Sequence, residues 1–189
     1  MAESAGVPPQ ATVLLVTGAQ ASGKSTVGRA VAARASRGVF LDGDTFWQAV
    51  VSGRADVGEQ PTAEALEQLH LRYRALGLAA RVYAEAGFTT VVADNVYGEA
   101  VAVVRAAVAP LRLLTVALVP SPEAVAARER ARRSGAYALW EGPGRGLLDA
   151  VRTFDAWVRA TPADLHHDST AETPDQTAAA VHGWLLTAR

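Results

Sequence analysis

An α/β fold built around a parallel sheet is the architecture that this sequence predicts. Two observations predict it: apolar strand-like runs alternate with helix-like segments, and a glycine-containing loop joins the first strand directly to the first helix. In addition, carboxylates follow two of the apolar runs. Ligands of open parallel sheets bind beyond the carboxyl ends of the strands, so we expect the functional residues at that edge.

The predicted strands are residues 12–17, 39–41, 89–93, 113–119 and 164–168. The predicted helices are residues 26–36, 45–52, 62–86, 100–108, 147–159 and 173–187, with one more from residue 121. Thr62, Ser121 and Thr173 are expected N-caps, because a side-chain oxygen before an apolar repeat can accept a free backbone N–H. Gly87 and Pro110 are expected to end the helices before them. A glycine-rich stretch, residues 135–146, interrupts the alternation.

Length and composition predict one cytoplasmic domain over residues 1–189. The chain has 189 residues, of which 50% are hydrophobic, and this is enough for a sizeable core. Its formal net charge of −1 gives no general attraction to nucleic acid or to a membrane. Cysteine is absent, which excludes disulfides and cysteine chemistry. Residues 1–10 are expected to be flexible, and they lack the pattern of a signal peptide.

The stretch Gly18–Ser25 reads G-x-x-x-x-G-K-S, the phosphate-binding P-loop pattern. In this pattern the glycines let successive N–H groups face phosphate oxygens, the lysine reaches the β- and γ-phosphates, and the serine hydroxyl can bind Mg²⁺. Lys24 is the only lysine among 18 basic residues. The alternative is a glycine-rich turn that binds nothing. The expected ATP-binding residues here are Gly18, Ala19, Gln20, Ala21, Ser22, Gly23, Lys24, Ser25 and Thr26.

Two further strands are expected to end in carboxylates beside this loop. Asp42 and Asp44 follow the second strand, and Asp94 follows the third. Phosphoryl transfer needs a metal and a group that orients or deprotonates the acceptor. We therefore predict Asp44 as the base, with Ser25, Asp42 and Asp94 as Mg²⁺ ligands. The alternatives are that Asp44 caps the next helix, that Asp42 caps the turn, and that Asp94 contacts the acceptor or only caps its turn.

An arginine cluster precedes the glycine-rich stretch. Arg128 and Arg132 lie four residues apart and so share one side of the predicted helix, whereas Arg130 and Arg133 point elsewhere. On a mobile lid over residues 128–146, the first pair would neutralise a transferring phosphoryl group and exclude water. The alternative is a solvated helix face.

Several residues near the strand ends are candidates for contact with an acceptor molecule. Four aromatic side chains are expected either to line an acceptor pocket or to pack in the core, and the two roles are given equal weight. They are Phe46, Trp47, Tyr73 and Tyr97. Three arginines are expected either to hold an anionic substrate or to lie on the surface: Arg54, Arg72 and Arg74. His166 and His167 have no third ligand at metal spacing, so they do not predict a zinc site.

Five motifs together carry a family resemblance that covers most of the chain in order. They are Gly18-x4-Gly23-Lys24-Ser25, Gly43-Asp44-x-Phe46, Asp94-Asn95-Val96-Tyr97-Gly98, Arg128-Glu129-Arg130-Ala131-Arg132, and Asp168-Ser169-Thr170 with Pro174. This set resembles the chloramphenicol phosphotransferase-like group of P-loop kinases and, more distantly, shikimate, gluconate and adenylylsulfate kinases.

The resemblance implies a three-layer P-loop NTPase fold with strand order 2-3-1-4-5. It also implies ATP and Mg²⁺ as cofactors, Asp44 as base, a lid at residues 128–132, and Asp168, Ser169 and Thr170 near the adenine. Substrate residues do not carry over from the family; the candidate acceptor contacts, chosen for their places near the strand ends, are Asp44, Phe46, Arg54, Asp94, Asn95 and Tyr97. The family's R-x-x-A-R-G-D-R run is not preserved after Arg132, so the chemistry of the lid is expected to differ.

The leading interpretation is a kinase that phosphorylates a hydroxyl of a small molecule, either an antibiotic or a metabolite. Three alternatives stay open. They are a nucleotide or nucleoside kinase, a non-catalytic nucleotide-dependent regulatory module, and a toxin that phosphorylates a cell-wall sugar nucleotide with a partner antitoxin.

Overall fold

The computed structural model describes residues 11–188, so the expected flexible segment 1–10 lies outside it. Five strands form one parallel sheet: β1 (Thr12–Gly18), β2 (Gly38–Asp42), β3 (Thr89–Ala93), β4 (Arg112–Leu118) and β5 (Leu165–His167). Their order is β2-β3-β1-β4-β5. Both the fold class and the strand order predicted above are therefore confirmed.

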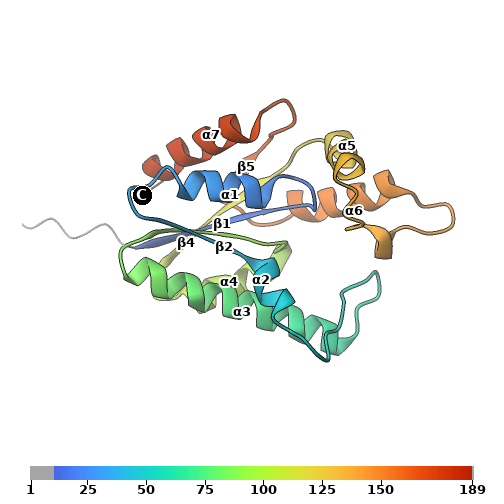
Figure 1. The fold of residues 1–189 in the computed structure, drawn as a ribbon, viewed down its shortest axis with the longest axis horizontal. Coiled ribbons are helices and arrows are strands. Elements are labelled where there is room, and N and C mark those ends of the chain that lie inside the picture. Colours follow the sequence, from blue (N-terminus) through green and yellow to red (C-terminus); the bar gives the residue numbers. More distant parts are fainter. Residues whose placement is uncertain (1–10, 189) are drawn as a thin grey trace, which may run out of the picture.

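Helices cover both faces of this sheet (Figure 1). They are α1 (Lys24–Ala32), α2 (Gly43–Gln48), α3 (Ala63–Glu85), α4 (Val101–Val108), α5 (Pro122–Arg132), α6 (Leu147–Arg159) and α7 (Pro174–Thr187), with short 3-10 turns η1 (Gly98–Ala100) and η2 (Ala138–Trp140). Within residues 11–188, none of these helices combines the length and the apolar character needed to cross a membrane.

The central strand β1 divides the core between the two faces. Val13 and Leu15 pack with α3 and α4, whereas Leu14 and Val16 pack with α1 and α7. This alternation follows from the two-residue period of a strand, and both faces are apolar because the sheet is covered on both sides. A third cluster joins α5 and α6 beyond the carboxyl end of the sheet. α6 contacts β1 and β4, and Ala19 and Ala117 belong to the third cluster, so this cluster packs at the carboxyl end of these two strands.

Helix boundaries differ from the sequence prediction at two places that matter for the site. The first helix begins at Lys24 rather than residue 26, because Gly23 is its N-cap with φ of 102°. The second begins at Gly43 rather than residue 45, because the Asp42 carboxylate accepts the Asp44 N–H. Three other helices are capped as predicted, by Thr62, Ser121 and Thr173.

The glycine-rich stretch is more ordered than its composition indicates. It contains the 3-10 turn η2, which the sequence did not predict, and Trp140 is buried there. Trp140 packs with Phe154 and Trp157 of α6, with ring centroids 4.9 Å and 5.3 Å away. Aromatic packing against α6 therefore holds a segment that glycines alone would leave loose.

Candidate active site

The loop between β1 and α1 is wound tightly, so that any other residue would clash at Gly18 and would be strained at Gly23. A Cβ on Gly18 would lie 2.6 Å from Ser22 Oγ and 2.9 Å from the Leu118 carbonyl oxygen. Ala21 and Gly23 have positive φ values of 60° and 102°. Such a curled backbone presents N–H groups at the start of α1, which is a suitable cradle for anions.

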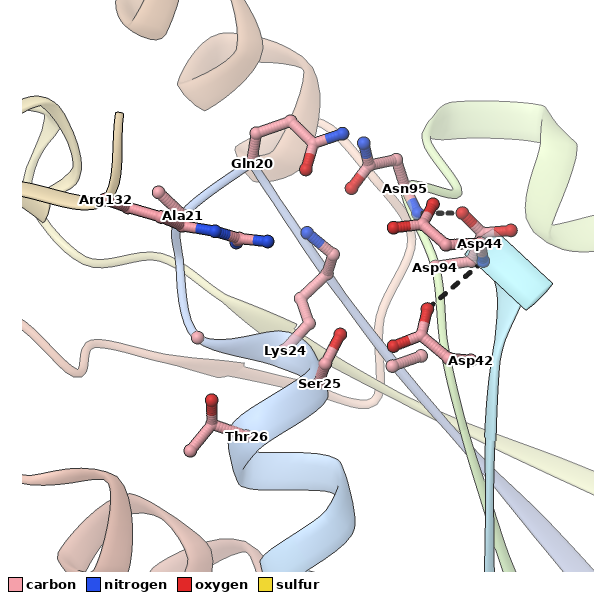
Figure 2. A pocket seen from close by; sticks show the side chains of 12 residues that line it. Gln20, Ala21, Lys24, Ser25, Thr26, Asp42, Asp44, Asp94, Asn95 and Arg132 are labelled. Atoms are coloured by element: carbon pink, nitrogen blue, oxygen red, sulfur yellow. Dashed lines mark hydrogen bonds between the residues drawn. The ribbon is translucent and has the colours of Figure 1, made fainter. Parts of the chain in front are cut away.

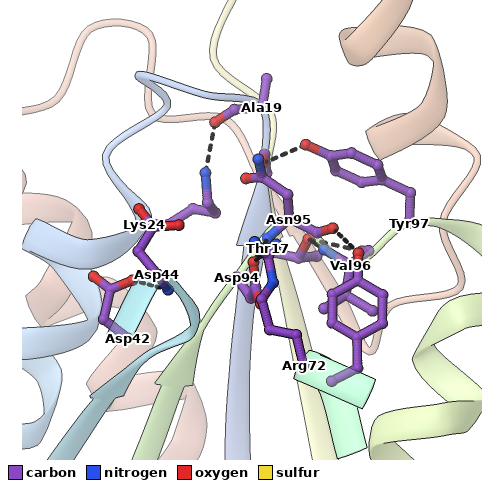
Figure 3. A network of polar contacts seen from close by, with 12 residues as sticks. Thr17, Ala19, Lys24, Asp42, Asp44, Arg72, Asp94, Asn95, Val96 and Tyr97 are labelled. Carbon is purple, nitrogen blue, oxygen red and sulfur yellow. Dashed lines mark hydrogen bonds and ion pairs between the residues drawn. The ribbon is translucent and has the colours of Figure 1, made fainter. Parts of the chain in front are cut away.

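Lys24 projects from the first residue of α1 into this cradle. Its Nζ donates to the Ala19 carbonyl oxygen at 2.8 Å (Figure 3). Burial lowers the pKa of Lys24 to about 8, although Asp94, Asp44 and Asp42 act in the opposite direction. A bound phosphate would add negative charge next to the ammonium group and so favour its protonated form.

A small cavity of about 70 Å³ gathers side chains from four separate parts of the chain. Figure 2 shows Lys24 facing the carboxylates at the ends of β2 and β3, with Arg132 of α5 reaching in from the opposite side. The lining residues are Gln20, Ala21, Gly23, Lys24, Ser25, Thr26, Asp42, Asp44, Ala93, Asp94, Asn95 and Arg132. The structure thus brings together most of the phosphate, metal and base candidates of the sequence analysis.

Asp42 and Asp44 occupy different structural roles at the end of β2. Asp42 Oδ1 accepts the Asp44 backbone N–H at 3.1 Å, so Asp42 caps α2. The alternative in which Asp44 is the cap is therefore wrong. Among residues 11–188 the Asp44 carboxylate accepts no hydrogen bond, and the residue is exposed at the cavity. Asp44 is consequently the carboxylate that is free to meet a ligand.

Asp94 is held much more tightly than Asp44. Its side chain is 2% exposed, and its Oδ1 accepts from Arg72 Nη2 at 2.5 Å and from the Asn95 N–H at 2.6 Å (Figure 3). Burial raises the pKa of Asp94 to about 6 despite these two donors. Its Oδ2 is buried without a hydrogen-bond partner in the described part of the chain.

Gly43 explains how the two strand ends approach each other so closely. A Cβ on Gly43 would lie 2.0 Å from Asp94 Oδ2 and 2.3 Å from Asp94 Cγ. Only glycine lets the Asp94 carboxylate lie against the backbone at the start of α2. This contact sets Asp44, the next residue, relative to Asp94.

Arg72 is a site residue whose partner the sequence did not reveal. It lies on α3, 22 residues before Asp94, and its guanidinium group also stacks near the rings of Trp47 and Tyr73. The sequence analysis named Arg72 only as a substrate or surface residue. No local spacing signal could have found a pair that forms between a helix and a distant strand end.

The predicted lid begins with two differently placed arginines. Arg128 donates to the carbonyl oxygens of Ser22 at 3.2 Å and Ser169 at 3.0 Å, so it joins the P-loop to the segment after β5. Arg132 lines the phosphate cavity without such a contact. Arg130 and Arg133 are exposed. The two members of the predicted pair therefore face the same ligand region at different points.

The start of the glycine-rich stretch is anchored to the P-loop. The Tyr137 hydroxyl donates to the Gln20 carbonyl oxygen at 2.8 Å, and Tyr137 is fully buried. Glu129 accepts the Ser134 hydroxyl at 2.6 Å and the Ala136 N–H at 3.3 Å. These contacts fix residues 134–137 next to the phosphate cavity.

A second cavity of about 350 Å³ continues from the first between α1, α5 and α7. The two share Ala21, Gly23, Thr26 and Arg132. Ser169, one of the residues that the resemblance placed near the adenine, lines this second cavity. Asp168 and Thr170 do not line it; Asp168 Oδ1 instead accepts the Thr170 N–H at 2.9 Å within their own turn.

A third cavity of about 680 Å³ opens on the other side of the phosphate cavity, between α3 and α6. It shares Gln20 and Asn95 with the phosphate cavity. Its wall is largely aromatic and apolar, with Trp47, Leu66, Leu69, Tyr73, Tyr97, Leu139, Trp140, Phe154 and Trp157. Of the candidate acceptor contacts, Asn95 and Tyr97 line it.

Phe46 and Arg54 are placed differently from those two candidates. Phe46 packs partly buried against the core cluster of α3 and α4, and its neighbour Trp47 faces the third cavity instead. Arg54 stacks over Trp47 and lies 3.8 Å from Asp56, outside the lining of the cavity.

The donor set is compatible with Mg²⁺ held jointly by protein and phosphate. No group of three or more histidine or acidic side chains suited to a metal occurs among residues 11–188. Mg²⁺ in nucleotide sites uses one or two carboxylates and keeps waters and phosphate oxygens as its other ligands. Ser25 and Asp42 line the cavity, and the partnerless Asp94 Oδ2 is a further oxygen there.

A parallel sheet in this order with a lysine-bearing loop after β1 defines the class of P-loop kinase-like proteins. The chain belongs to the chloramphenicol phosphotransferase-like family, which it matches over residues 11–185. A search of curated proteins finds no match.

Solved structures with the same fold include kinases and a resistance protein. An adenylylsulfate (APS) kinase from Mycobacterium tuberculosis, in complex with AMPPNP and APS, is 20% identical, with coverage of 95% of this chain and 99% of that one and a TM-score of 0.67. A shikimate kinase from Acinetobacter baumannii is 18% identical, with 95% coverage of both chains and a TM-score of 0.60. A tunicamycin resistance protein from Deinococcus radiodurans is 17% identical, with coverage of 93% and 96% and a TM-score of 0.57. At these identities the likeness concerns the fold.

Proposed function

We propose that this protein transfers the γ-phosphoryl group of ATP to a hydroxyl of a neutral, ring-bearing small molecule. The observation that carries the proposal is the order of the three cavities. The phosphate cavity, with Lys24 and Asp44, lies between the second cavity and the aromatic third cavity and shares residues with each. A nucleotide entering from one side and an acceptor entering from the other would meet there.

The residues of the phosphate cavity have separate tasks in this proposal. Lys24 and the P-loop N–H groups bind the phosphates, and Arg132 neutralises charge on the group in transfer. Asp44 orients the acceptor hydroxyl and accepts its proton, since its carboxylate has no other partner among residues 11–188. Mg²⁺, when bound near Ser25 and Asp42, would supply charge neutralisation between the phosphates.

The wall of the third cavity supports a neutral acceptor. Of the lysines and arginines in the described part of the chain, Arg72 alone lines it, and Arg72 is paired with Asp94. Of the acidic residues in its wall, Glu59 pairs with Arg145 and Asp56 lies 3.8 Å from Arg54. An acidic substrate would therefore find no unpaired lysine or arginine of residues 11–188 there. A volume of about 680 Å³ with several indole and phenyl rings is suited to a ring-bearing molecule.

An antibiotic is one acceptor of this kind. The family name and the resistance protein among the structural neighbours are consistent with it. A neutral hydroxylated metabolite of similar size is the other possibility, and both have the same chemistry at the reacting hydroxyl.

The test is a screen of hydroxylated compounds with γ-labelled ATP and Mg²⁺. It compares neutral ring-bearing acceptors, antibiotics included, with acidic acceptors of similar size and with nucleosides. We expect labelled product from the neutral class and none from Lys24→Ala, because Lys24 is the lysine of the phosphate cradle. Label transfer to acidic acceptors or to nucleosides alone would contradict the proposed acceptor. Nucleotide binding without transfer to any compound would favour the regulatory alternative.

A further inference from the structure

The wall of the second cavity contains a carboxylate that the proposed transfer reaction does not use. Glu172 lies between β5 and α7, and it lines the cavity together with Ser169, Pro174 and Thr177. A nucleotide whose phosphates occupy the P-loop would extend its base into this space. A carboxylate in that wall can only accept hydrogen bonds, so it favours a base that presents a donor to it.

Glu172 is fixed in place by two neighbours. Its Oε2 lies 2.7 Å from His167 Nε2 and accepts the Thr177 hydroxyl at 2.8 Å. These hydrogen bonds lower the pKa of Glu172, so the group is an ionised acceptor and His167 Nε2 is the donor. Oε1 accepts no hydrogen bond from the part of the chain that the structure describes, and the side chain is 32% exposed. One rigidly held oxygen is therefore free toward a ligand.

We propose that Glu172 makes this site selective for adenine nucleotides by accepting a hydrogen bond from the exocyclic 6-amino group. The proposal rests on the proposed function, because it takes the bound molecule to be the nucleotide donor. Adenine offers an N–H₂ donor at position 6, whereas guanine and hypoxanthine offer a carbonyl oxygen there. A carboxylate oxygen attracts the first and repels the second.

A carboxylate can also select guanine, but that requires a different state of Glu172. Guanine presents two adjacent donors, N1–H and N2–H₂, and a bidentate contact with them uses both carboxylate oxygens. Here Oε2 already accepts from His167 and Thr177. A single free acceptor fits the single amino group of adenine.

The experiment measures the binding of ADP, IDP and GDP in Mg²⁺ by calorimetry, which needs no knowledge of the phosphate acceptor. IDP differs from ADP at position 6 and in the proton that its N1 carries, and it lacks the 2-amino group of GDP. The wild-type protein should bind ADP more tightly than IDP and GDP by roughly 10- to 100-fold, the usual value of a hydrogen bond to a charged group. Glu172→Ala should bring the ADP-to-IDP affinity ratio close to one.

Glu172→Gln separates selection from support of the fold. With its amide oxygen toward His167 and Thr177, the side chain presents an N–H₂ group to the cavity, so the ratio should fall to one or reverse. If Glu172 had a purely structural role, the substitution would weaken the binding of all three nucleotides equally and leave the affinity ratio unchanged. Glu123→Gln on α5 is the matched control, because that exposed carboxylate pairs with Arg152 and does not line the cavity.

Equal affinity of the wild-type protein for the three nucleotides, a preference for GDP, or an unchanged ratio in both Glu172 variants would overturn the inference. Equal affinity or an unchanged ratio would leave the proposed transfer reaction standing, whereas a preference for GDP would replace ATP by GTP as its phosphoryl donor. Failure of every nucleotide to bind would instead contradict the proposed function, and the inference with it.

Discussion

Replacing Gly43 by alanine tests the contact that joins the ends of β2 and β3. The added methyl group would lie 2.0 Å from Asp94 Oδ2, whereas an ordinary contact begins near 3.4 Å. Asp94 cannot retreat freely, because it is 2% exposed and is held by Arg72 and the Asn95 N–H. The start of α2 has to move instead, and Asp44 moves with it.

The expected effect has two parts. Overpacking at a buried position costs about 1–3 kcal/mol of folding stability, and in a domain of this size each kcal/mol lowers Tm by about 2–4 °C. A displacement of about 1 Å at a catalytic group can lower the rate about 10²-fold. Nucleotide affinity should change much less, because the three atoms nearest to the added methyl group belong to Asp94 and not to the P-loop.

The assay combines thermal unfolding, ADP binding and label transfer to the acceptor found in the screen. Gly183→Ala is the control: no atom lies within 4 Å of its ideal Cβ, and it is inside α7, so the change should stabilise the protein by about 0.5–1 kcal/mol. A Gly43→Ala protein with wild-type Tm and wild-type transfer rate would refute the argument that this contact positions Asp44.

Three other expectations concern charged residues of the site. Arg132→Ala should lower kcat by about 10²-fold with little change in ADP affinity. Arg128→Ala removes the contacts to Ser22 and Ser169, so it should weaken ADP binding as well. Wild-type kinetics in both variants would show that the two arginines belong to a solvated helix face. Folding stability without nucleotide or Mg²⁺ should fall by up to about 3 kcal/mol as pH rises from about 4 to 6. The reason is that the Asp94 carboxyl group has a pKa of about 6 in the folded protein and an ordinary pKa of 3.8. On raising the pH, the unfolded chain therefore releases the Asp94 proton before the folded protein does. Asp94→Asn should remove that part of the pH dependence, and a wild-type slope in this variant, measured by denaturant unfolding, would show that Asp94 is not its source.

The sequence was sufficient for the sheet and for the phosphate cradle. Both depend on local signals: apolar runs of strand length, and glycines at positions where the backbone has positive φ, such as Gly23. Asp42, Asp44 and Asp94 could be predicted to meet because parallel strands end at one edge. Their different roles could not, since capping by Asp42 depends on where α2 begins, and this start was misjudged by two residues.

Contacts between segments that are distant in the chain could not be predicted from the sequence. Arg72 meets Asp94 from the middle of α3, and no spacing rule relates these two positions. Trp47 rather than Phe46 faces the third cavity, because α2 has only six residues and its orientation is set by packing on the core. Glu172 gave no signal in the sequence, since its place in the cavity wall depends on His167 and Thr177.

The most direct test of the account is the transfer rate of Asp44→Asn on the acceptor found in the screen. The substitution keeps the size of the side chain and removes a carboxylate that makes no hydrogen bond within residues 11–188, so stability and ADP affinity should hold. Asp175→Asn, on an exposed carboxylate that pairs with Arg34, is the control. We predict that kcat falls 10²- to 10⁴-fold in Asp44→Asn, which corresponds to about 3–5 kcal/mol of barrier, and that it does not change in the control. A kcat within a few-fold of wild type would contradict the role of Asp44 as the base.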